Sequence, residues 1–416
     1  MKIATLSIGD EVAFGEIVDT NAPFIASRLY DIGLKVSQHL AVGDVEGDII
    51  EAIRTLAATS EAVIATGGLG PTIDDITARA AAKATDRRLI LNETALLHLK
   101  EFLTKRGRNI DPANEKQALL PSKSSLIPNP TGTACGFHFQ FNGCSFIFLP
   151  GVPKEMARMV EESVIPLLRE RNPKGKIIRV KVLKVFGVSE AKLDTLLAGV
   201  TGPGSPVTVA FQVDFPQILV KLRAEGDNET HARAALDAVY RKSREILHRH
   251  IFAEDNETMD SVVAALFNEK GLTLSLAESC SGGLVAKRIT DIPGSSAYFL
   301  EGAVTYSNAA KMRRLGVSPQ ILDEKGAVSS EVVMAMARGM RKLSGSDIAL
   351  AVTGVAGPDG GTTEKPVGTV FIALATHSFC QAKKYRFSGN RAEIRTITSF
   401  MALDWLRRYL LTHNTC

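Results

Sequence analysis

The segment Ala277 to Gly283 places two serine hydroxyls, a thiol and two glycines in one short stretch. The apolar run Leu272 to Leu276 precedes it and Leu284 to Ile289 follows, so the pattern predicts strand, tight turn and helix. Unpaired backbone N–H groups at a helix start can hold a developing oxyanion beside an attacking atom. The turn therefore indicates nucleophilic chemistry, although Ser279 or Ser281 could instead simply cap the helix.

Two side chains of this turn are rival nucleophiles, Ser279 and Cys280. A serine needs a base, and no histidine is suitably placed in the last part of the chain. Lys311 can serve as base if burial lowers its pKa, and the Tyr306 hydroxyl can relay or orient the proton. A thiol is intrinsically more reactive than a hydroxyl, so the residues alone leave the attacking atom open. Taken singly, Tyr306 and Lys311 also fit ordinary packing or solvated positions.

A glycine-rich turn and an arginine in the same part of the chain could hold an anion. Thr353 ends a predicted strand, Gly354 and Gly357 follow it, and Arg391 begins the last predicted helix. Backbone N–H groups and the guanidinium fork are good donors to a phosphate or a carboxylate. Arg391 alone could equally cap a helix or form a salt bridge.

A second group of polar residues lies near the start of the chain. The glycine-rich loop Gly67 to Gly70 leads into a predicted helix over 78–85 and offers backbone N–H groups to a phosphate. Asp74 and Asp75 at the same helix start would repel a phosphate unless a cation lay between them. The combination predicts a divalent metal with a phosphate, which suits pyrophosphate cleavage. The alternative is that both aspartates only favour the helix dipole.

The elements that must position these residues follow three patterns. Residues 1–172 alternate strands and helices, which predicts an α/β domain with a largely parallel sheet that binds ligands at the carboxyl ends of its strands. Residues 175–253 predict a small α+β connecting domain, and residues 254–257 a polar linker. Residues 256–416 predict a mixed-sheet α/β domain. The expected strands of the first and last domains are 3–8, 34–42, 62–66, 145–149, 272–276, 302–306, 348–353, 368–375 and 381–387.

Composition excludes several classes of protein. The chain has 416 residues, of which 45% are hydrophobic and 23% charged, with a formal net charge of +4. These values predict two or three folded domains and no strong electrostatic attraction to nucleic acid. The sequence contains no long apolar run typical of a membrane span or a signal peptide. Its five cysteines lack metal-type spacing, so we expect a cytoplasmic protein.

Four motifs resemble those of the full-length CinA (competence/damage-inducible) family, and the resemblance covers essentially the whole chain. One departure is Ser281, where many relatives have threonine, but the hydroxyl is kept. The resemblance implies a MoaB/MogA-like (molybdopterin-binding-like) first domain, a KH-like middle domain, and a last domain similar to stand-alone nicotinamide-nucleotide amidases. The motifs are Gly9–Glu11 with Asp19–Asn21, Thr66–Thr77, Leu149–Met156 and Ala277–Gly283.

For the last domain, the resemblance implies hydrolysis of nicotinamide mononucleotide to nicotinic acid mononucleotide and ammonia, a step of pyridine-nucleotide salvage. Ser279 falls on the nucleophile of the family, with Tyr306 and Lys311 as its partners. No cofactor is expected for this reaction. The substrate-binding residues that we assign are Glu278, Ser281, Gly282, Gly283, Thr353, Gly354, Gly357 and Arg391.

For the first domain, the resemblance implies an ADP-ribose pyrophosphatase that depends on Mg²⁺, Mn²⁺ or Co²⁺. We expect a homodimer that binds small nucleotides and contacts neither membrane nor nucleic acid directly. A regulatory nucleotide-binding protein linked to competence or DNA damage is the alternative from a different class. The assigned metal ligands are Asp74, Asp75, Asp10 and Glu11, and the assigned nucleotide-binding residues are Gly9, Asn21, Gly67, Gly68, Gly70, Thr72, Gly151 and Pro153.

Overall fold

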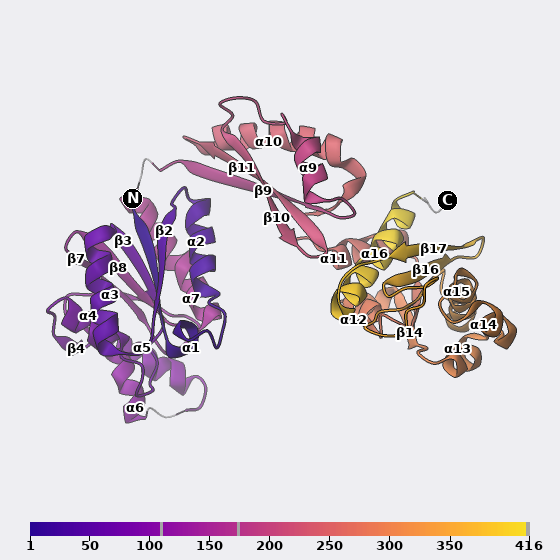
Figure 1. Ribbon diagram of the computed structural model, residues 1–416. Helices are drawn as coiled ribbons and strands as arrows, with labels where there is room; N and C mark the ends of the chain where they lie inside the picture. The colour runs from indigo at the N-terminus through magenta and orange to yellow at the C-terminus, as the bar shows by residue number, and fades with distance from the viewer. Residues whose placement is uncertain (109–110, 173–174, 413–416) are drawn as a thin grey trace. The chain divides into compact units, whose positions relative to one another are not determined.

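The computed structural model describes residues 1–108, 111–172 and 175–412, so Cys416 lies outside the described residues. Sheets of six, four and five strands follow one another along the chain, with a further two-stranded sheet (Figure 1). The chain divides into two compact units, which we describe separately. The first contains Met1–Val180, Gly204–Val207 and Arg223–Ala238, and the second contains the remainder.

The six-stranded sheet of the first unit is mostly parallel, as predicted, and has the order β2-β1-β3-β8-β7-β6. Its first four strands in this order run parallel, so their carboxyl ends meet at one edge. The last two strands extend the sheet antiparallel. The strands are β1 (Ile3–Ile8), β2 (Val36–Val42), β3 (Ala62–Thr66), β6 (Ser125–Ile127), β7 (Gly136–Phe141) and β8 (Cys144–Leu149).

Helices cover both faces of this sheet (Figure 1). Alternate residues of a strand point to opposite faces. Val63 and Ala65 of β3 accordingly pack with α3 (Glu46–Thr59) and α4 (Thr77–Ala84), while Ala62 and Ile64 pack with α2 and α7. Both faces are therefore apolar, which leaves the strand ends as the place for polar chemistry. The other elements are α1 (Asp10–Ala13), α2 (Asn21–Asp31), β4 (Leu89–Leu91), α5 (Glu93–Thr104), α6 (Pro112–Glu115), β5 (Leu119–Pro121), α7 (Pro153–Met159) and α8 (Ile165–Arg171).

The four-stranded sheet has the order β10-β11-β9-β12 and, with two helices, forms the predicted α+β domain. The last strand corrects the prediction of a polar linker beginning at residue 254, because Glu254 still belongs to β12. Ile251, Ala253 and Glu254 pair antiparallel with β9, so the backbone is held in the sheet despite the charged side chain. The elements are β9 (Ile177–Val185), α9 (Glu190–Leu197), β10 (Val207–Asp214), β11 (Gln217–Gly226), α10 (Glu229–Leu247) and β12 (Ile251–Glu254).

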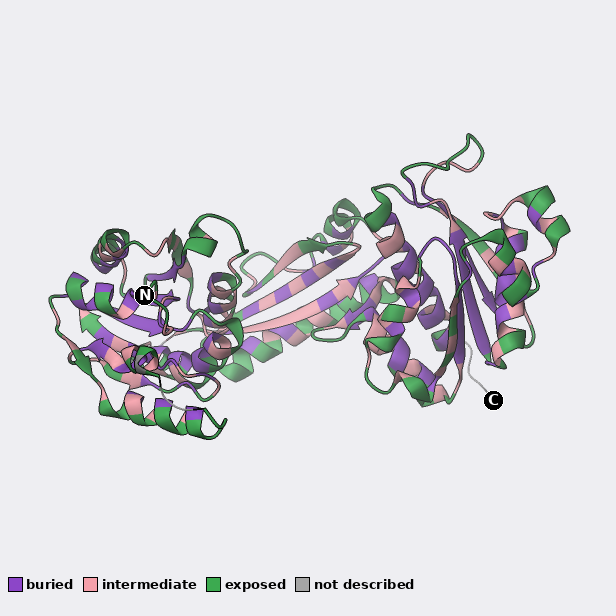
Figure 2. Ribbon diagram, turned by 90° about the horizontal axis from the view of Figure 1, so that it is seen from below, coloured by how far each residue is buried: buried purple, intermediate pink, exposed green. Residues whose placement is uncertain are grey.

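The five-stranded sheet of the second unit is mixed, as predicted, with the order β14-β13-β15-β16-β17. Strands β14, β13 and β15 run parallel, whereas β16 and β17 are antiparallel. Figure 2 shows the buried residues concentrated in these strands and on the inner sides of the helices around them. The strands are β13 (Leu274–Glu278), β14 (Phe299–Val304), β15 (Ile348–Gly354), β16 (Thr369–Ala375) and β17 (Cys380–Arg386).

Two helical layers enclose this sheet. On one face, Leu276 and Leu350 pack against α11 and α16. On the other face, small residues such as Ala277 and Ala351 contact α15. The helices are α11 (Met259–Lys270), α12 (Leu284–Thr290), α13 (Asn308–Leu315), α14 (Pro319–Lys325), α15 (Ser330–Ser344) and α16 (Arg391–Thr412).

Two strand boundaries differ from the prediction in a way that affects the site. The strand predicted over 272–276 is found at Leu274–Glu278, and the strand predicted over 302–306 is found at Phe299–Val304. Glu278 is therefore the last residue of its strand, and Tyr306 belongs to the following loop. Parallel pairing with β15 holds Glu278 in register opposite Val352, which overrides its low strand propensity. No helix in the described ranges is long and apolar enough to cross a membrane.

Candidate functional site

The carboxyl ends of β13, β14 and β15 lie side by side, because these strands are parallel neighbours. Each of these strands is followed by a turn in which the sequence predicted reactive or ligand-binding residues. The first turn holds Ser279, the second holds Tyr306, and the third leads to Gly357. The topology of the sheet therefore brings three separate sequence motifs to one edge.

The structure brings together the predicted nucleophile and the predicted base. Lys311 Nζ lies 3.1 Å from Ser279 Oγ. The Ser279 side chain is largely buried, and Lys311 is only 1% exposed. Burial lowers the pKa of Lys311, because a charged ammonium is poorly solvated there. A lysine in this setting has an increased fraction of neutral amine, the form that accepts a proton.

The other contacts of Lys311 define where its lone pair would point. Its Nζ donates to the Thr305 carbonyl oxygen at 2.8 Å and to the Tyr306 carbonyl oxygen at 3.2 Å. Carbonyl oxygens only accept, so these two bonds use both protons of a neutral amine. The remaining position on nitrogen then faces Ser279 Oγ. The site thus orients Lys311 as a proton acceptor for this hydroxyl.

Cys280, the rival nucleophile, has a different environment. It is 6% exposed, and burial raises the pKa of its thiol to about 12. The neighbouring Glu278 carboxylate raises it further, and only nearby backbone N–H groups and Lys311 oppose these effects. A thiol of this kind carries almost no thiolate at neutral pH. The geometry favours Ser279 over Cys280 as the attacking group.

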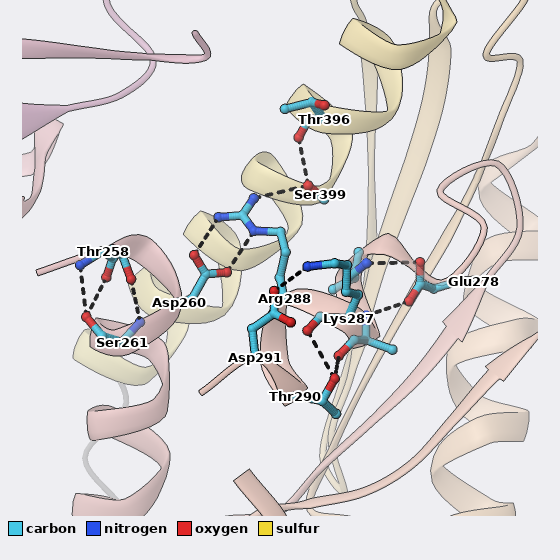
Figure 3. A network of polar contacts seen from close by, with 12 residues as sticks. Thr258, Asp260, Ser261, Glu278, Lys287, Arg288, Thr290, Asp291, Thr396 and Ser399 are labelled. Carbon is cyan, nitrogen blue, oxygen red and sulfur yellow. Dashed lines mark hydrogen bonds and ion pairs between the residues drawn. The ribbon is translucent and has the colours of Figure 1, made fainter. Parts of the chain in front are cut away.

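Glu278, predicted to bind substrate, instead caps helix α12. Its carboxylate accepts hydrogen bonds from the backbone N–H groups of Gly283 at 3.0 Å, Val285 at 3.2 Å and Ala286 at 2.7 Å. The residue is 1% exposed, so these bonds compensate a buried charge (Figure 3). The alternative that the Ser281 hydroxyl caps this helix is not found: it is buried without a hydrogen-bond partner among the described residues. The structure does not test the prediction that Ser281 binds substrate.

Arg391 joins the other two turns of the site. Its Nη1 donates to the Gly357 carbonyl oxygen at 2.8 Å, and its Nη2 lies 3.0 Å from the Tyr306 hydroxyl. Within the described chain, this hydroxyl makes no hydrogen bond to Ser279 or Lys311, so the predicted relay through Tyr306 is not assembled. The Tyr306 side chain is 59% exposed, in contrast to the buried Lys311.

The predicted glycine and threonine positions have mainly structural contacts. Thr353 Oγ1 donates to the Ala327 carbonyl oxygen at 2.9 Å. Gly357 has a φ of +77°, and a Cβ there would lie 2.7 Å from a Val367 methyl carbon. Gly354 allows a similarly close approach to β16, while Gly282 and Gly283 both have positive φ in the turn before α12. These residues shape the turns around the nucleophile.

Arg395 is a site residue that the sequence reasoning missed. Its Nε and Nη2 both donate to the Ser281 carbonyl oxygen, at 3.1 and 2.9 Å. It lies one helical turn after Arg391 on α16, so the same helix face contacts two turns of the site. The i, i+4 spacing of the two arginines was a signal that could have identified it.

A second candidate site lies at the carboxyl ends of the parallel strands in the first unit. It is a cavity of about 420 Å³. The close approach of its walls requires glycine at position 67, where a Cβ would lie 1.9 Å from the Ile8 carbonyl oxygen. Asn21 Nδ2 donates to the Gly151 carbonyl oxygen, and its Oδ1 has no partner among the described residues. The predicted residues that line the cavity are Gly9, Glu11, Asn21, Gly67, Gly68, Gly70, Asp74, Asp75, Gly151 and Pro153.

Two other predicted residues are placed differently. Thr72 does not line the cavity; its backbone N–H and hydroxyl both bind Asp75 Oδ2, at 2.8 and 2.5 Å. Asp10 and Asp44 each accept from the other's backbone N–H, at 2.9 and 3.0 Å. Asp44 was missed by the sequence reasoning, although it follows the end of β2 and so satisfies the strand-end rule.

The negative charge of the carboxylates at this site would suit a cation, but their side chains are not arranged around a common metal position. Burial, Asp10, Glu11 and Asp74 all raise the pKa of Asp44, whereas the Asp10 backbone N–H lowers it. This clustering of negative charge would be relieved by a divalent ion. No group of three or more His, Cys, Asp or Glu in the described residues is arranged to hold a metal. One or two carboxylates with substrate phosphate oxygens would suffice for Mg²⁺.

Three family models match successive parts of the chain. The CinA C-terminal domain model matches residues 256–410, a probable molybdopterin-binding domain model matches 4–170, and a damage-inducible protein CinA KH domain model matches 180–253. These models occur in the order that the motifs predicted. The three matched ranges also correspond to the parts of the chain that form the six-, four- and five-stranded sheets.

The sequences of two relatives align with nearly the whole chain. A CinA-like protein of Geotalea uraniireducens is 62% identical over 99% of this chain and 98% of its own, and one of Geobacter sulfurreducens is 58% identical over 99% and 100%. A crystal structure of a competence/damage inducible protein from Agrobacterium tumefaciens is 40% identical over 37% of this chain and 95% of its own, with a TM-score of 0.36. The chain therefore belongs to the CinA-like protein family.

Proposed function

We propose that the second unit hydrolyses the carboxamide of nicotinamide mononucleotide to nicotinic acid mononucleotide and ammonia. The observation that carries this proposal is the 3.1 Å contact between Lys311 Nζ and Ser279 Oγ, with both neutral-amine protons accounted for by carbonyl oxygens. A serine beside an oriented lysine of lowered pKa is suited to acyl transfer. The family resemblance supplies the substrate.

In this reaction Ser279 Oγ attacks the carboxamide carbon while Lys311 accepts its proton. The resulting tetrahedral oxyanion needs hydrogen-bond donors, and we assign this role to backbone N–H groups of the turn before α12. Lys311 then returns the proton to the leaving nitrogen, and ammonia departs. Water attacks the acyl ester with Lys311 again as base, which releases the carboxylic acid and restores Ser279.

We propose that the guanidinium of Arg391 binds the anionic end of this substrate. It is a neighbour of Tyr306 and Gly357, and both of its assigned bonds are to uncharged groups. Its charge is therefore not neutralised by a carboxylate in these contacts. A phosphate would gain a charge-assisted hydrogen bond there. We place the 5′-phosphate of the mononucleotide near Arg391 on this basis.

The deciding experiment is ammonia release from nicotinamide mononucleotide. Ser279→Ala should abolish it, and Cys280→Ala should retain most of it, because the Lys311 amine is hydrogen-bonded to the Ser279 hydroxyl. Both variants remove one small buried group, so each controls for the other's packing effect. The opposite result would assign the attack to Cys280, and no ammonia from the wild type would reject the amidase.

We propose a second activity for the first unit, metal-dependent cleavage of ADP-ribose to AMP and ribose 5-phosphate. The favouring observation is that its cavity combines a glycine-rich loop at the helix start with several carboxylates, and that burial, followed by the neighbouring carboxylates, raises the pKa of Asp44. Of the carboxylates that line this cavity, Glu11, Asp44, Asp74 and Asp75 are the residues that would hold Mg²⁺, Mn²⁺ or Co²⁺. Such an ion would neutralise the pyrophosphate charge and activate water.

Formation of AMP from ADP-ribose tests this second activity. The wild type should form AMP with at least one of the three ions, and Asp74→Asn should reduce the rate. Glu93→Gln, in the first turn of α5 and outside the cavity, is a matched control. No AMP with any ion would reject the activity and would favour a regulatory nucleotide-binding protein.

We further propose that the protein is a cytoplasmic homodimer. Symmetric dimers are the commonest soluble oligomers, and the family resemblance implies one. The four cysteines in the described chain are free, which suits a reducing compartment. Light scattering on the purified protein should give twice the chain mass of 44.7 kDa. A mass of one chain at all concentrations would contradict the dimer.

A further inference from the structure

A cavity of about 730 Å³ in the second unit takes no part in the functions proposed above. All of its wall residues belong to this unit, and they come mainly from the end of α10 and the turn after it, from β12 and from the last two turns of α16. Arg407 Nη1 of α16 donates to the Ile251 carbonyl oxygen of β12 at 3.4 Å, so two of these walls are in direct contact. A cavity of this size can hold a small organic ligand.

The walls of this cavity carry more positive than negative charge. Four arginines and two glutamates line it, which leaves a formal excess of two positive charges. Behind the wall, the buried carboxylate of Asp404 is shared by two of these arginines. Arg407 donates to its Oδ1 at 3.0 and 2.8 Å, and Arg408 Nε donates to its Oδ2 at 2.6 Å. One carboxylate therefore serves two guanidinium groups.

The two glutamates of the walls already have partners. The Glu254 carboxylate accepts from the Tyr240 hydroxyl at 2.9 and 3.0 Å and pairs at 2.8 Å with Lys181, which lies outside the cavity. Glu257 Oε2 accepts from the Glu254 backbone N–H at 2.9 Å. Neither carboxylate forms a hydrogen bond with an arginine of the cavity in the described chain. The nearest such pair is Arg244 with Glu254, at 3.8 Å.

Two guanidinium groups have donors to spare. Arg249 is exposed and forms no hydrogen bond or ion pair with the rest of the described residues. Arg408 binds Asp404 through Nε, and its two Nη groups have no partner in the same part of the chain. Guanidinium N–H groups form charge-assisted hydrogen bonds with phosphate oxygens. The cavity therefore offers two unsatisfied cationic groups to an anion, and a dianion matches the excess charge of its walls.

Apolar side chains border the same space. Leu411, on the last turn of α16, is 55% exposed, and Val262 of α11 is only partly buried. Both line the cavity, together with the buried Phe252. An apolar group placed against them would remove their surface from water, which is favourable. A bare inorganic anion cannot use this part of the wall, so the combination favours an organic anion.

We propose that this cavity binds an organic phosphate monoester. Arg249 and the Nη groups of Arg408 hold the phosphate, and the apolar part of the ester lies against Val262 and Leu411. The site is separate from both sites of the proposed function and depends on neither of them.

Calorimetry on the full-length protein with phenyl phosphate tests this proposal. Inorganic phosphate supplies the anion alone, and phenol supplies the ring alone. Phenyl phosphate should bind about tenfold more tightly than either, because only the ester uses both the guanidinium groups and the apolar wall. Added NaCl should weaken its binding. An affinity no higher than that of inorganic phosphate or of phenol would overturn the proposal.

Two substitutions at exposed positions locate the binding. Arg249→Gln removes the unpaired guanidinium, and Leu411→Glu replaces the apolar contact with a negative charge. Each should weaken phenyl phosphate binding by about fivefold or more. Arg313→Gln on α13 and Leu343→Glu on α15 are the matched controls, because both positions are exposed and lie outside the cavity. The controls should bind phenyl phosphate as the wild type does.

Phosphate esters could also enter the amidase site, where Arg391 is proposed to hold a phosphate. The binding that Arg249→Gln weakens should therefore persist in Arg391→Gln. Binding that is lost in Arg391→Gln but unchanged in Arg249→Gln and Leu411→Glu would place the ester elsewhere and overturn the proposal. Since Arg249 and Leu411 lie in neither proposed active site, this outcome is independent of whether the protein forms ammonia or AMP.

Discussion

A buried lysine is unstable as an ammonium unless a carboxylate faces it, and Lys311 instead faces a hydroxyl and two carbonyl oxygens. Desolvation is the main reason that its pKa is lowered. This placement favours the neutral amine in the folded protein. Lys311, whose ammonium form is penalised by desolvation, is the residue that the proposed reaction requires as a base.

The lowered pKa of Lys311 predicts the pH dependence of ammonia release. As pH rises through this pKa, the amine loses its proton and becomes able to accept one from Ser279, so the rate should rise with a midpoint below the ordinary lysine pKa. Lys311→Arg should lose on the order of 10²-fold or more in rate, because a guanidinium stays protonated. Rates measured across pH for both proteins test this.

Lys287→Met provides the matched control for that experiment. Lys287 is an exposed lysine of α12 that pairs with Asp291 at 2.5 Å. Its removal should leave the pH profile unchanged. A rate that does not rise with pH in the wild type, or an active Lys311→Arg variant, would show that Lys311 is not the base.

Individual residue roles were only partly predictable from the sequence. Ser279 and Lys311 were paired in advance, because a serine without a histidine needs another base. The role of Glu278 was not predicted, since a carboxylate next to a nucleophile suggests substrate contact, and only the fold shows that it faces the start of α12. Asp44 and Arg395 were missed because their importance comes from neighbours far away in sequence.

At the scale of elements, helix α12 is fixed at both ends. Glu278 binds its first backbone N–H groups, and Arg288 near its last turn contacts Asp260 of α11 and Ser399 of α16 (Figure 3). The Arg288 to Asp260 pair is bidentate, with distances of 2.7 and 3.0 Å. These contacts hold the turn that carries Ser279 in one position.

Glu278→Gln should weaken this cap. An amide keeps one acceptor but loses the charge that stabilises the helix start, and its NH₂ would face backbone N–H groups. We expect a loss of about 2–3 kcal/mol in the free energy of unfolding. Trp405 is the single tryptophan of the chain and is buried in the core of this domain, so its fluorescence in urea reports the relevant transition.

The exposed Glu269→Gln substitution on α11 controls for removing a negative charge. It should change the Trp405 transition by only a few tenths of a kcal/mol. If Glu278→Gln is as stable as this control, the carboxylate does not contribute to the helix start.

Helix α16 makes a related prediction through Arg395. Both of its bonds hold the Ser281 carbonyl oxygen, so Arg395→Met should let the turn move and should lower kcat by about tenfold to a hundredfold. KM for nicotinamide mononucleotide should stay nearly constant. A raised KM with unchanged kcat would instead mean that Arg395 holds the substrate. Arg313→Met, on an exposed position of α13, is the control.

Most elements were predictable because their hydrophobic patterns match their burial. Strands β1 and β3 were found at the expected residues. The errors occur where tertiary pairing decides the boundary, as at β13, which ends two residues later than its apolar run, and at β12, where sheet pairing includes a charged residue. Local sequence does not contain the partner strand that determines these ends.

At the scale of the whole molecule, the two sites use separate supports. The residues that line the cavity of about 420 Å³ belong to the first unit, and Ser279, Lys311 and Arg391 belong to the second. Each site also lies at the strand ends of its own sheet, with its own apolar core. One chain therefore carries two candidate sites, one in each unit.

This separation predicts that the two activities are independent in the full-length protein. Ser279→Ala should abolish ammonia release and leave AMP formation from ADP-ribose unchanged, while Asp74→Asn should reduce AMP formation and leave ammonia release unchanged. Saturating ADP-ribose should likewise leave the KM for nicotinamide mononucleotide unchanged, and the urea transition of Trp405 should not shift. Linkage requires that any coupling of binding be reciprocal, so a change of fivefold or more, about 1 kcal/mol, in one direction must appear in the other. Such a reciprocal change would show that ligand binding in the two units is coupled. If no such change is found, each site binds its ligand independently of the other.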